Sequence, residues 1–176
     1  IWGPLLNGGR CVLHDEELPT ARGLGNTIRT GKVTTAWLTA ALFNAVVDED
    51  PLQLSGLHQL LIGGEALSVP HVRRALTALP QTQLINGYGP TECTDVVAWH
   101  EVDIDAPNEV LPIGRPVDNN QLYVLDRYDQ PLPVGAVGAV VSGAVIGTVG
   151  DALPAPSLCI SVNASPLVCG VVRVTL

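Results

Sequence analysis

Short apolar runs alternate with amphipathic stretches between residues 11 and 141 of this chain. Residues 10–13 follow a Gly-Gly pair and predict a short buried strand, and the β-branched run at 33–37 predicts a second one. Apolar residues spaced three and four apart over 37–47 predict an amphipathic helix. The acidic residues and the proline at 48–51 end that helix.

The alternation continues through the middle of the chain. Residues 57–62 predict a buried strand that runs into Gly63, and residues 82–85 predict another that leads to Asn86. An amphipathic stretch at 71–79 predicts a helix between these strands. Strands separated by a helix indicate an α/β fold, in which ligand loops follow the carboxyl ends of the strands. Both glycine-bearing loops have that position, which indicates one shared site.

Local signals mark the ends of elements elsewhere. Ser68 is a suitable N-cap for the central helix, Pro70 suits its first turn, and Pro80 stops it. Beyond residue 103 proline and polar residues dominate until 121–126, which predict a strand, and 129–131 predict a turn.

Composition narrows the possible functions. A length of 176 residues with 47% apolar residues allows one domain with its own core. A net charge of −8, with nine basic residues spread along the chain, argues against nucleic acid as a partner. No uninterrupted run approaches the roughly 18 apolar residues of a membrane helix. Four cysteines without CxxC spacing favour reduced thiols in a cytoplasmic protein. The histidines lack metal-binding spacing, and no Ser-His-Asp arrangement is supported.

The run at 86–92, NGYGPTE, carries the most chemistry. Its glycines and proline exclude a regular helix and favour a tight loop. On such a loop Tyr88 offers a stacking face, Thr91 a hydroxyl, and Glu92 an oxygen ligand for a hard cation. Those groups can hold a nucleotide together with its magnesium ion.

The two ends of the chain are unusual. The sequence begins at Ile1 and contains no Met, and we expect it to be an internal part of a longer protein. From residue 140 onward the only charged side chains are Asp151 and Arg173, and no sustained helical period occurs. Such a segment has no polar face to present to water.

Several motifs in this order resemble the adenylation domain of nonribosomal peptide synthetases. They are LIGGEAL at 61–67, NGYGPTE at 86–92, IGRP at 113–116 and YVLD at 123–126. The resemblance covers roughly residues 1–140. It places the chain in the adenylate-forming superfamily, with acyl-CoA synthetases and luciferases.

The resemblance implies both a fold and a reaction. The fold is α/β, part of the large N-terminal domain of the adenylate-forming fold, with mixed sheets, flanking helices and the start of a small β subdomain. It divides the chain into a partial adenylation domain at 1–140 and an atypical tail at 141–176. In that family an amino acid reacts with ATP, in the presence of Mg²⁺, to give an aminoacyl adenylate and pyrophosphate. The acyl group then passes to the phosphopantetheine thiol of a carrier domain, and carrier and condensation domains of the same synthetase are the implied partners.

The resemblance also assigns nucleotide-binding residues by position. Tyr88 stacks on adenine, and Asn86 hydrogen-bonds the edge of that base. Thr91 contacts the α-phosphate region and Glu92 ligates Mg²⁺, so both are assigned to catalysis. The remaining positions, which border the nucleotide mainly through backbone atoms, are Gly63, Gly64, Glu65, Gly87 and Gly89.

A substrate pocket is implied near these loops. Its positions within this chain are Trp37, Leu61, Gly63, Gly87, Asp95 and Val96. Trp37 and Leu61 as a floor, with glycines leaving space, suit a small or medium aliphatic side chain, with valine as the candidate. Asp95 fits this poorly, because an unpaired carboxylate beside an apolar ligand is costly, so it faces solvent or binds a polar substituent. An ordinary core position remains the alternative for Trp37.

Other family parts are expected outside the chain. The phosphate loop and the substrate-anchoring aspartate belong upstream of Ile1, and the ribose-binding aspartate and the adenylation lysine belong downstream of the tail. The tail departs from the family pattern from residue 138, and we hypothesise translation out of frame after about Gly143, which the nucleotide sequence would decide. An acyl-CoA or aryl-acid ligase of the same superfamily and a noncatalytic nucleotide-binding α/β module are the alternative functions.

The 176-residue chain alone is expected not to catalyse adenylation, because it lacks these parts. The measurement is amino-acid-dependent exchange of pyrophosphate into ATP. Exchange above the background without amino acid would refute this expectation.

Overall fold

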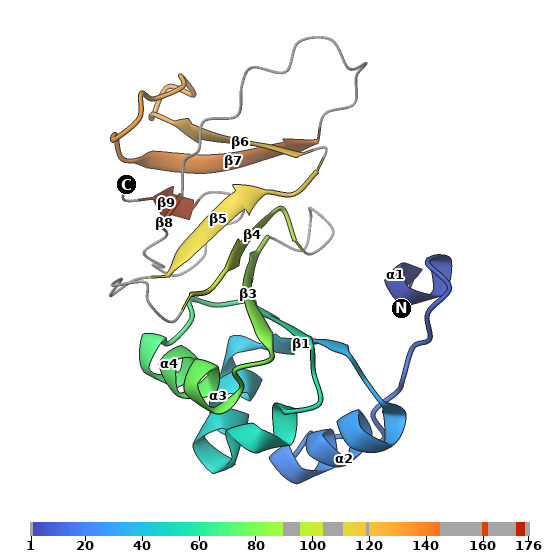
Figure 1. The fold of residues 1–176 in the computed structure, drawn as a ribbon. Coiled ribbons are helices and arrows are strands. Elements are labelled where there is room, and N and C mark those ends of the chain that lie inside the picture. The colour runs from blue at the N-terminus through green and yellow to red at the C-terminus, as the bar shows by residue number, and fades with distance from the viewer. Residues whose placement is uncertain are drawn as a thin grey trace.

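The computed structural model describes residues 2–89, 96–103, 111–118, 120–144, 160–161 and 172–174. Helices dominate the first half of the chain and strands the second half (Figure 1). In chain order the elements are α1 (Trp2–Leu6), α2 (Ala21–Gly31), β1 (Thr35–Thr39), α3 (Ala40–Glu49), the 3₁₀ helix η1 (Pro51–Leu54), β2 (Gln59–Gly63), α4 (Val69–Ala78), β3 (Gln83–Tyr88), β4 (Ala98–Glu101), β5 (Pro112–Pro116), β6 (Asn120–Leu125), β7 (Gly138–Ala144), β8 (Ile160–Ser161) and β9 (Val172–Val174).

The larger sheet has the strand order β1-β2-β3-β4-β5-β8. Strands β1, β2 and β3 pair in parallel, and β4, β5 and β8 continue the sheet with antiparallel pairs. Helices α2, α3 and α4 lie together below β1 and β3 in Figure 1. A smaller antiparallel sheet, β6-β7-β9, forms the upper end of the molecule in that view. A mixed sheet with flanking helices and a separate β unit confirms the predicted fold class.

The core forms where the parallel strands meet the helices. Leu60 and Ile62 of β2 and Phe43 of α3 have no exposed surface. Leu61, between the two buried residues of β2, is only half-buried, because successive side chains alternate between the two faces of a strand. The remaining buried members of this core are Ala21, Ile28, Leu38, Ala40, Val46, Val47, Leu54, Leu57, Val72, Ala75, Leu79, Leu84 and Val102. The helices thus cover one face of the parallel strands, and Leu61 belongs to the other face.

The central helices and strands follow the hydrophobic pattern. The predicted helices are confirmed as α3 and α4, and α4 begins directly after Ser68 with Pro70 in its first turn. The predicted strands at 33–37, 57–62, 82–85 and 121–126 are confirmed as β1, β2, β3 and β6, with ends shifted by up to three residues. None of the helices in the described part of the chain is long and apolar enough to cross a bilayer.

The N-terminal segment differs from the prediction. Residues 10–13 do not form a strand but lie exposed or half-exposed on the arm that joins α1 to α2 (Figure 1), where no described strand pairs with them. Residues 21–31 form helix α2, which the pattern does not predict. Its N-cap is Thr20, whose hydroxyl accepts a hydrogen bond from the backbone N–H of Gly23 at 3.0 Å. Glycine disfavours a helix by about 1 kcal/mol per residue. Because Gly23 and Gly25 lie near the start of α2, the sequence does not predict this helix.

Strand β3 is longer than predicted. Asn86, Gly87 and Tyr88 continue the strand and do not form the predicted tight loop. Each is paired with a residue of β4, from Asn86 with His100 to Tyr88 with Ala98. Ladder hydrogen bonds to β4 therefore override the local preference of Gly87 for a turn.

Two strands arise where the sequence indicates irregular structure. β5 is bounded by prolines at both ends, Pro112 and Pro116, and pairs with β4 through its last two residues. β7 pairs with the whole of β6, from Asn120 with Ala144 to Leu125 with Ala139. The predicted domain boundary at residue 140 falls within β7 and stays a prediction.

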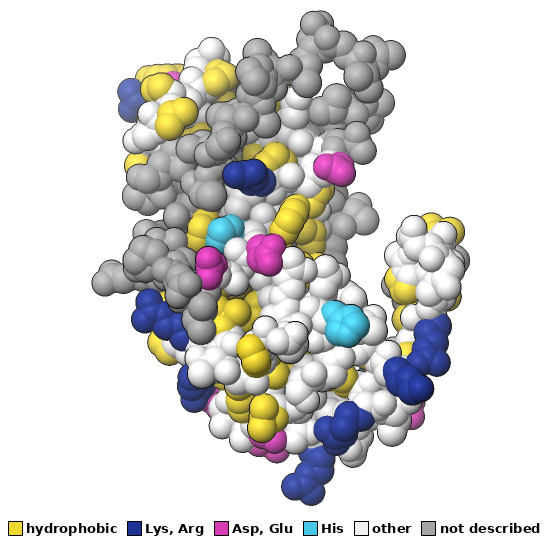
Figure 2. Space-filling model, viewed as in Figure 1, with side chains coloured by type: hydrophobic (Ala, Val, Ile, Leu, Met, Phe, Trp, Pro, Cys, Tyr) yellow, Lys and Arg dark blue, Asp and Glu magenta, His cyan; other side chains and the backbone are white. Residues whose placement is uncertain are grey.

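Basic side chains gather along α2, although the sequence suggests that they are scattered. Figure 2 shows dark blue side chains in a row over α2 and the adjoining arm. The exposed basic residues of this part of the chain are Arg10, Arg22, Arg29 and Lys32. Arg10 donates a hydrogen bond to the carbonyl oxygen of Gly31 in the last turn of α2. The helix dipole stabilises cations near the C-terminus of a helix, where Arg10, Arg29 and Lys32 lie. The position of these three residues therefore needs no nucleic-acid partner to explain it.

Leu60→Ala should lower the free energy of unfolding by about 2–5 kcal/mol, because it leaves a cavity between β2 and the helices. The matched control is Leu18→Ala on the arm, where the leucine is 83% exposed. Urea denaturation of both variants measures the difference. Equal losses in the two variants would contradict the assigned core.

Candidate functional site

Two glycines lie side by side at the carboxyl ends of β2 and β3. Gly63 and Gly87 are register partners. A Cβ on Gly63 would lie 2.5 Å from the carbonyl oxygen of Gly87, which no side chain tolerates. A Cβ on Gly87 would meet Cγ2 of Val96 at 3.5 Å, an ordinary contact. The pair forms a floor without side chains, called the glycine floor below, in which only the Gly87 position has room for a methyl group.

Trp37 and Leu61 lie beside the glycine floor. They are register partners on β1 and β2, and Leu61 precedes Gly63 by two residues, so all of them share one face of the sheet. The Nε1 atom of Trp37 lies 3.8 Å from the Cβ position of Gly63. Trp37 is 43% exposed, and it is therefore not an ordinary core aromatic. The predicted pocket residues that the structure brings together are Trp37, Leu61, Gly63, Gly87 and Val96.

Asn86 and Tyr88 belong to the opposite face of β3. Asn86 is 6% exposed, and its Nδ2 atom donates a 2.8 Å hydrogen bond to the carbonyl oxygen of Pro112, which ties β3 to β5. Tyr88 is half-buried and packs against the small apolar cluster around Ile113. The alternation of β3 thus separates the predicted nucleotide residues from Gly87, which faces the pocket side.

The other predicted nucleotide residues lie in the turns after these strands. Gly64 and Glu65 are exposed in the turn after β2, where Gly64 has a φ of +88° that favours glycine. Gly89 follows β3 directly. Thr91, Glu92 and Asp95 lie outside the described residues. Within the described ranges no three His, Cys, Asp or Glu residues gather into a group that could hold a metal ion.

His100 lies beside a predicted site residue, which the sequence does not reveal. It is the register partner of Asn86 on β4, and only the β3–β4 pairing brings the two together. Burial lowers the pKa of its imidazole, and the carboxylate of Glu101 opposes that shift. The lowered pKa reduces the positive charge that His100 places beside Asn86 near neutral pH.

Hydrogen bonds link Ser68, His71 and Asp48 in the folded protein. Oγ of Ser68 lies 2.6 Å from Nδ1 of His71, and Nε2 of His71 lies 3.2 Å from Oδ2 of Asp48. Asp48 comes from α3 and the other two from the start of α4, so no sequence spacing shows the contact. Arg74 also binds Asp48, and the carboxylate is 59% exposed. We interpret the group as a clamp between α3 and α4.

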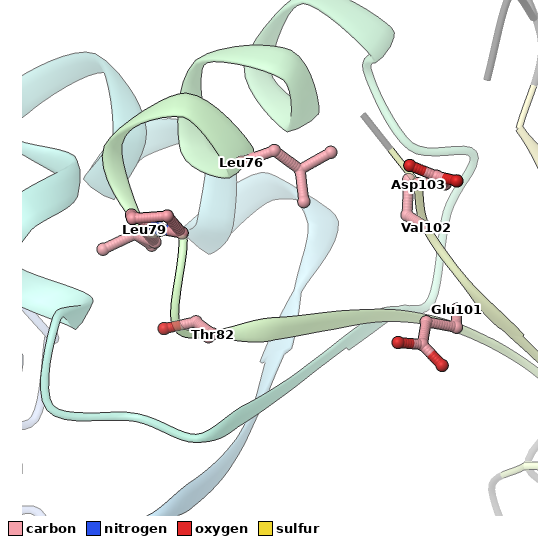
Figure 3. A pocket seen from close by; sticks show the side chains of 7 residues that line it. Leu76, Leu79, Thr82, Glu101, Val102 and Asp103 are labelled. Atoms are coloured by element: carbon pink, nitrogen blue, oxygen red, sulfur yellow. The ribbon is translucent and has the colours of Figure 1, made fainter. Parts of the chain in front are cut away.

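A separate cavity of about 520 Å³ lies near the C-terminal end of α4. Figure 3 shows the side chains that line it: some come from the end of α4 and others from the end of β4, and Thr82 lies just before β3. The residues lining it are Leu76, Leu79, Pro80, Thr82, Glu101, Val102 and Asp103. The glycine floor lies at the other end of β3, so this cavity is not part of the candidate site.

Comparison with known proteins decides the family. Residues 1–147 match the family model described as AMP-binding enzyme. The chain belongs to this family. Linear gramicidin synthase subunits C and B of Brevibacillus parabrevis are 48% and 47% identical to it over 144 residues, which is 81% of the chain. The chain spans only 2% and 3% of the length of these two relatives.

Solved structures agree with this assignment. PA1221, described as an NRPS protein containing adenylation and PCP domains, is similar with a TM-score of 0.79 and 37% identity, over 98% of this chain and 39% of that chain. The Klebsiella oxytoca NpsA N-terminal subdomain shares the fold, with a TM-score of 0.66 and 21% identity over 72% of this chain and 31% of that one. The predicted kinship with adenylation domains of nonribosomal peptide synthetases is confirmed.

Asp48→Asn should destabilise the protein at pH 7 and have little effect in acid. The hydrogen bond from Arg74, and after it the contact with His71, lowers the pKa of Asp48 in the folded state. Its stabilising contribution is therefore complete above the unfolded value of about 3.9 and is lost as the pH falls through the folded pKa.

Thermal unfolding between about pH 7 and pH 2 measures this effect. Glu49→Gln removes the same charge from the same helix end and serves as the control. A constant difference between wild type and Asp48→Asn across this range would contradict the clamp.

Proposed function

We propose that this chain forms part of an adenylation domain that activates an amino acid with ATP. The observation that carries the proposal is the alternation along β3, which turns Asn86 and Tyr88 to one face and Gly87 to the other. Asn86 shares its face with its register partner Ile62, which the helices cover, so the nucleotide would be held at the carboxyl end of β3 and the amino acid on the open face with Gly87. Their reacting groups would meet beyond its carboxyl end, where ligands bind in α/β sheets.

The nucleotide side suits adenine. The hydrogen bond from Nδ2 of Asn86 to Pro112 fixes the orientation of the side-chain amide. This orientation assigns Oδ1 as the atom that accepts from the exocyclic amine of the base. The ring of Tyr88 supplies the stacking face, and the glycines at 63, 64, 87 and 89 with Glu65 border the nucleotide through backbone atoms.

The substrate side suits a small or medium aliphatic side chain. The glycine floor leaves space, while Leu61, Val96 and the indole of Trp37 provide apolar contacts. Valine is the candidate substrate, and Asp95 would face solvent or bind a polar substituent. An apolar pocket of this kind separates substrates that differ by one methylene by about 1–3 kcal/mol.

The reaction is assigned to the residues that follow β3. A carboxylate oxygen of the amino acid would attack the α-phosphorus of ATP, the bond to the bridging oxygen would break, and pyrophosphate would leave. Thr91 would position the α-phosphate, and Glu92 would ligate the metal ion. Positioning and neutralisation of charge suffice for this displacement. The aminoacyl group then passes to the phosphopantetheine thiol of a carrier domain, in a synthetase that also holds a condensation domain.

The setting of the reaction is part of the proposal. Cys11 is an exposed free thiol, which suits a reducing compartment and supports a cytoplasmic location. The chain spans a few per cent of the curated relatives, so the remaining residues of the ATP site would belong to other parts of the parent protein.

Gly87→Ala and Tyr88→Ala should change different kinetic constants of the parent domain, meaning the complete adenylation domain that carries this sequence. The added methyl group fits the fold but narrows the pocket, so preference should shift to smaller amino acids by about 10–200-fold in kcat/KM, with the KM for ATP unchanged. Tyr88→Ala should raise the KM for ATP and leave the amino-acid preference unchanged. Pyrophosphate exchange with panels of amino acids and aryl acids measures both.

The control is Gly3→Ala on α1, where an added Cβ meets no atom within 4 Å. Exchange supported by aryl acids and not by amino acids would favour the aryl-acid ligase alternative. Absence of exchange with any acid in the wild-type parent domain would favour the noncatalytic module.

A further inference from the structure

Trp99 is a large aromatic residue that stays exposed in the middle of the sheet. Its strand, β4, has a neighbouring strand on each side, yet 43% of Trp99 is exposed. The preceding residue, Ala98, is completely buried. Successive residues of β4 therefore face the packed interior and the open side in turn, and Trp99 belongs to the open side. Tryptophan is enriched at binding surfaces, because its ring is apolar and its N–H is polar.

Trp99 shares a face with the glycine floor. It is the register partner of Gly87, which is the register partner of Gly63, so the three form one row across β4, β3 and β2. Neither glycine has a side chain to fill the space beside the indole. On its other side the row continues to Arg115, which is exposed and charged. An apolar group that contacts Trp99 would therefore lie on the glycine side.

Trp37 borders the same floor from its other end. Its Nε1 atom lies 3.8 Å from the Cβ position of Gly63, and it is exposed to the same extent as Trp99, at 43%. Strands β1 and β4 are three strand spacings apart, or about 14 Å. Trp37 precedes Thr39, the register partner of Gly63, by two residues, so the two indoles lie diagonally across the glycine floor. The two indoles border a groove over the glycine floor, and Glu101, which ends the row of Trp37 on β4, lies two residues from Trp99 on the same face. Such a groove suits an uncharged side chain, because a charged one would lose its hydration there.

We propose that Trp99 is a specificity residue, which forms the wall of the amino-acid groove opposite Trp37. The separation of the two indoles across the glycine floor limits the width of the side chain that the domain accepts. The proposal rests on the function proposed above and adds a residue to the pocket assigned there.

The test is pyrophosphate exchange by the parent adenylation domain with Trp99→Ala and Trp99→Phe, over a panel from alanine through valine and leucine to phenylalanine. Trp99→Ala should raise the kcat/KM of the bulkiest accepted amino acid, relative to valine, by about tenfold or more. Trp99→Phe keeps a flat apolar wall and should retain the wild-type ranking. The KM for ATP should not change in either variant.

The matched control is Tyr123→Ala on β6, where the tyrosine is also 43% exposed but belongs to the other sheet. An unchanged ranking in Trp99→Ala, with active wild type, would overturn the role of Trp99 and leave the proposed function intact. Absence of amino-acid-dependent exchange in the wild type would overturn both. If Trp99→Ala does not fold, Trp99→Leu replaces it, and a wild-type ranking in that variant overturns the role.

Discussion

The close parallel pairing of β2 with β3 is the constraint on which the site depends. At the end of this pair a Cβ on Gly63 would lie 2.5 Å from the carbonyl oxygen of Gly87. The two backbones can approach each other this closely only because glycine has no Cβ. The buried residues Leu60 and Ile62 hold β2 against the helices on the other face. Packing on one face of the sheet thus fixes the backbone that forms the floor on the other.

The alternation of a β-strand then distributes the chemistry. In β3 the nucleotide-side residues Asn86 and Tyr88 flank Gly87, which faces the glycine floor. The same alternation in β4 turns His100 toward Asn86 and Trp99 toward Gly87. In the proposed function, β3 and β4 would therefore contribute different side chains to the nucleotide and to the amino acid. This separation is what makes variants on the two faces independent probes.

The sequence predicts elements whose signals are local. Strand β2 and helix α4 follow from an apolar run and from Ser68 with the prolines around it, because burial and end signals act within a few residues. The motifs around Gly63 and Asn86 also identify the family, and with it five pocket positions that the structure brings onto one face. Helix α2 escapes detection because glycine lowers the propensity of a segment that tertiary packing nevertheless stabilises.

The remaining features depend on contacts between distant segments. Asn86 to Tyr88 look like a loop until β4 pairs with them, and the positions of His100 and Trp99 depend on that register. The hydrogen bonds between Ser68, His71 and Asp48 form only when helices α3 and α4 pack together. No spacing rule within one segment reveals such contacts, because they are set by the packing of whole elements.

The hydrogen bond between Asn86 and Pro112 has a consequence for the order in which the site is assembled. The two residues are 26 positions apart, on strands separated by β4. The glycine floor needs only β2 and β3, whereas the side-chain amide of Asn86 gains its orientation when β5 joins the sheet. Closing longer loops costs more entropy and slows the contacts that depend on them. During folding, the glycine floor is therefore expected to form before the side-chain amide of Asn86 is oriented.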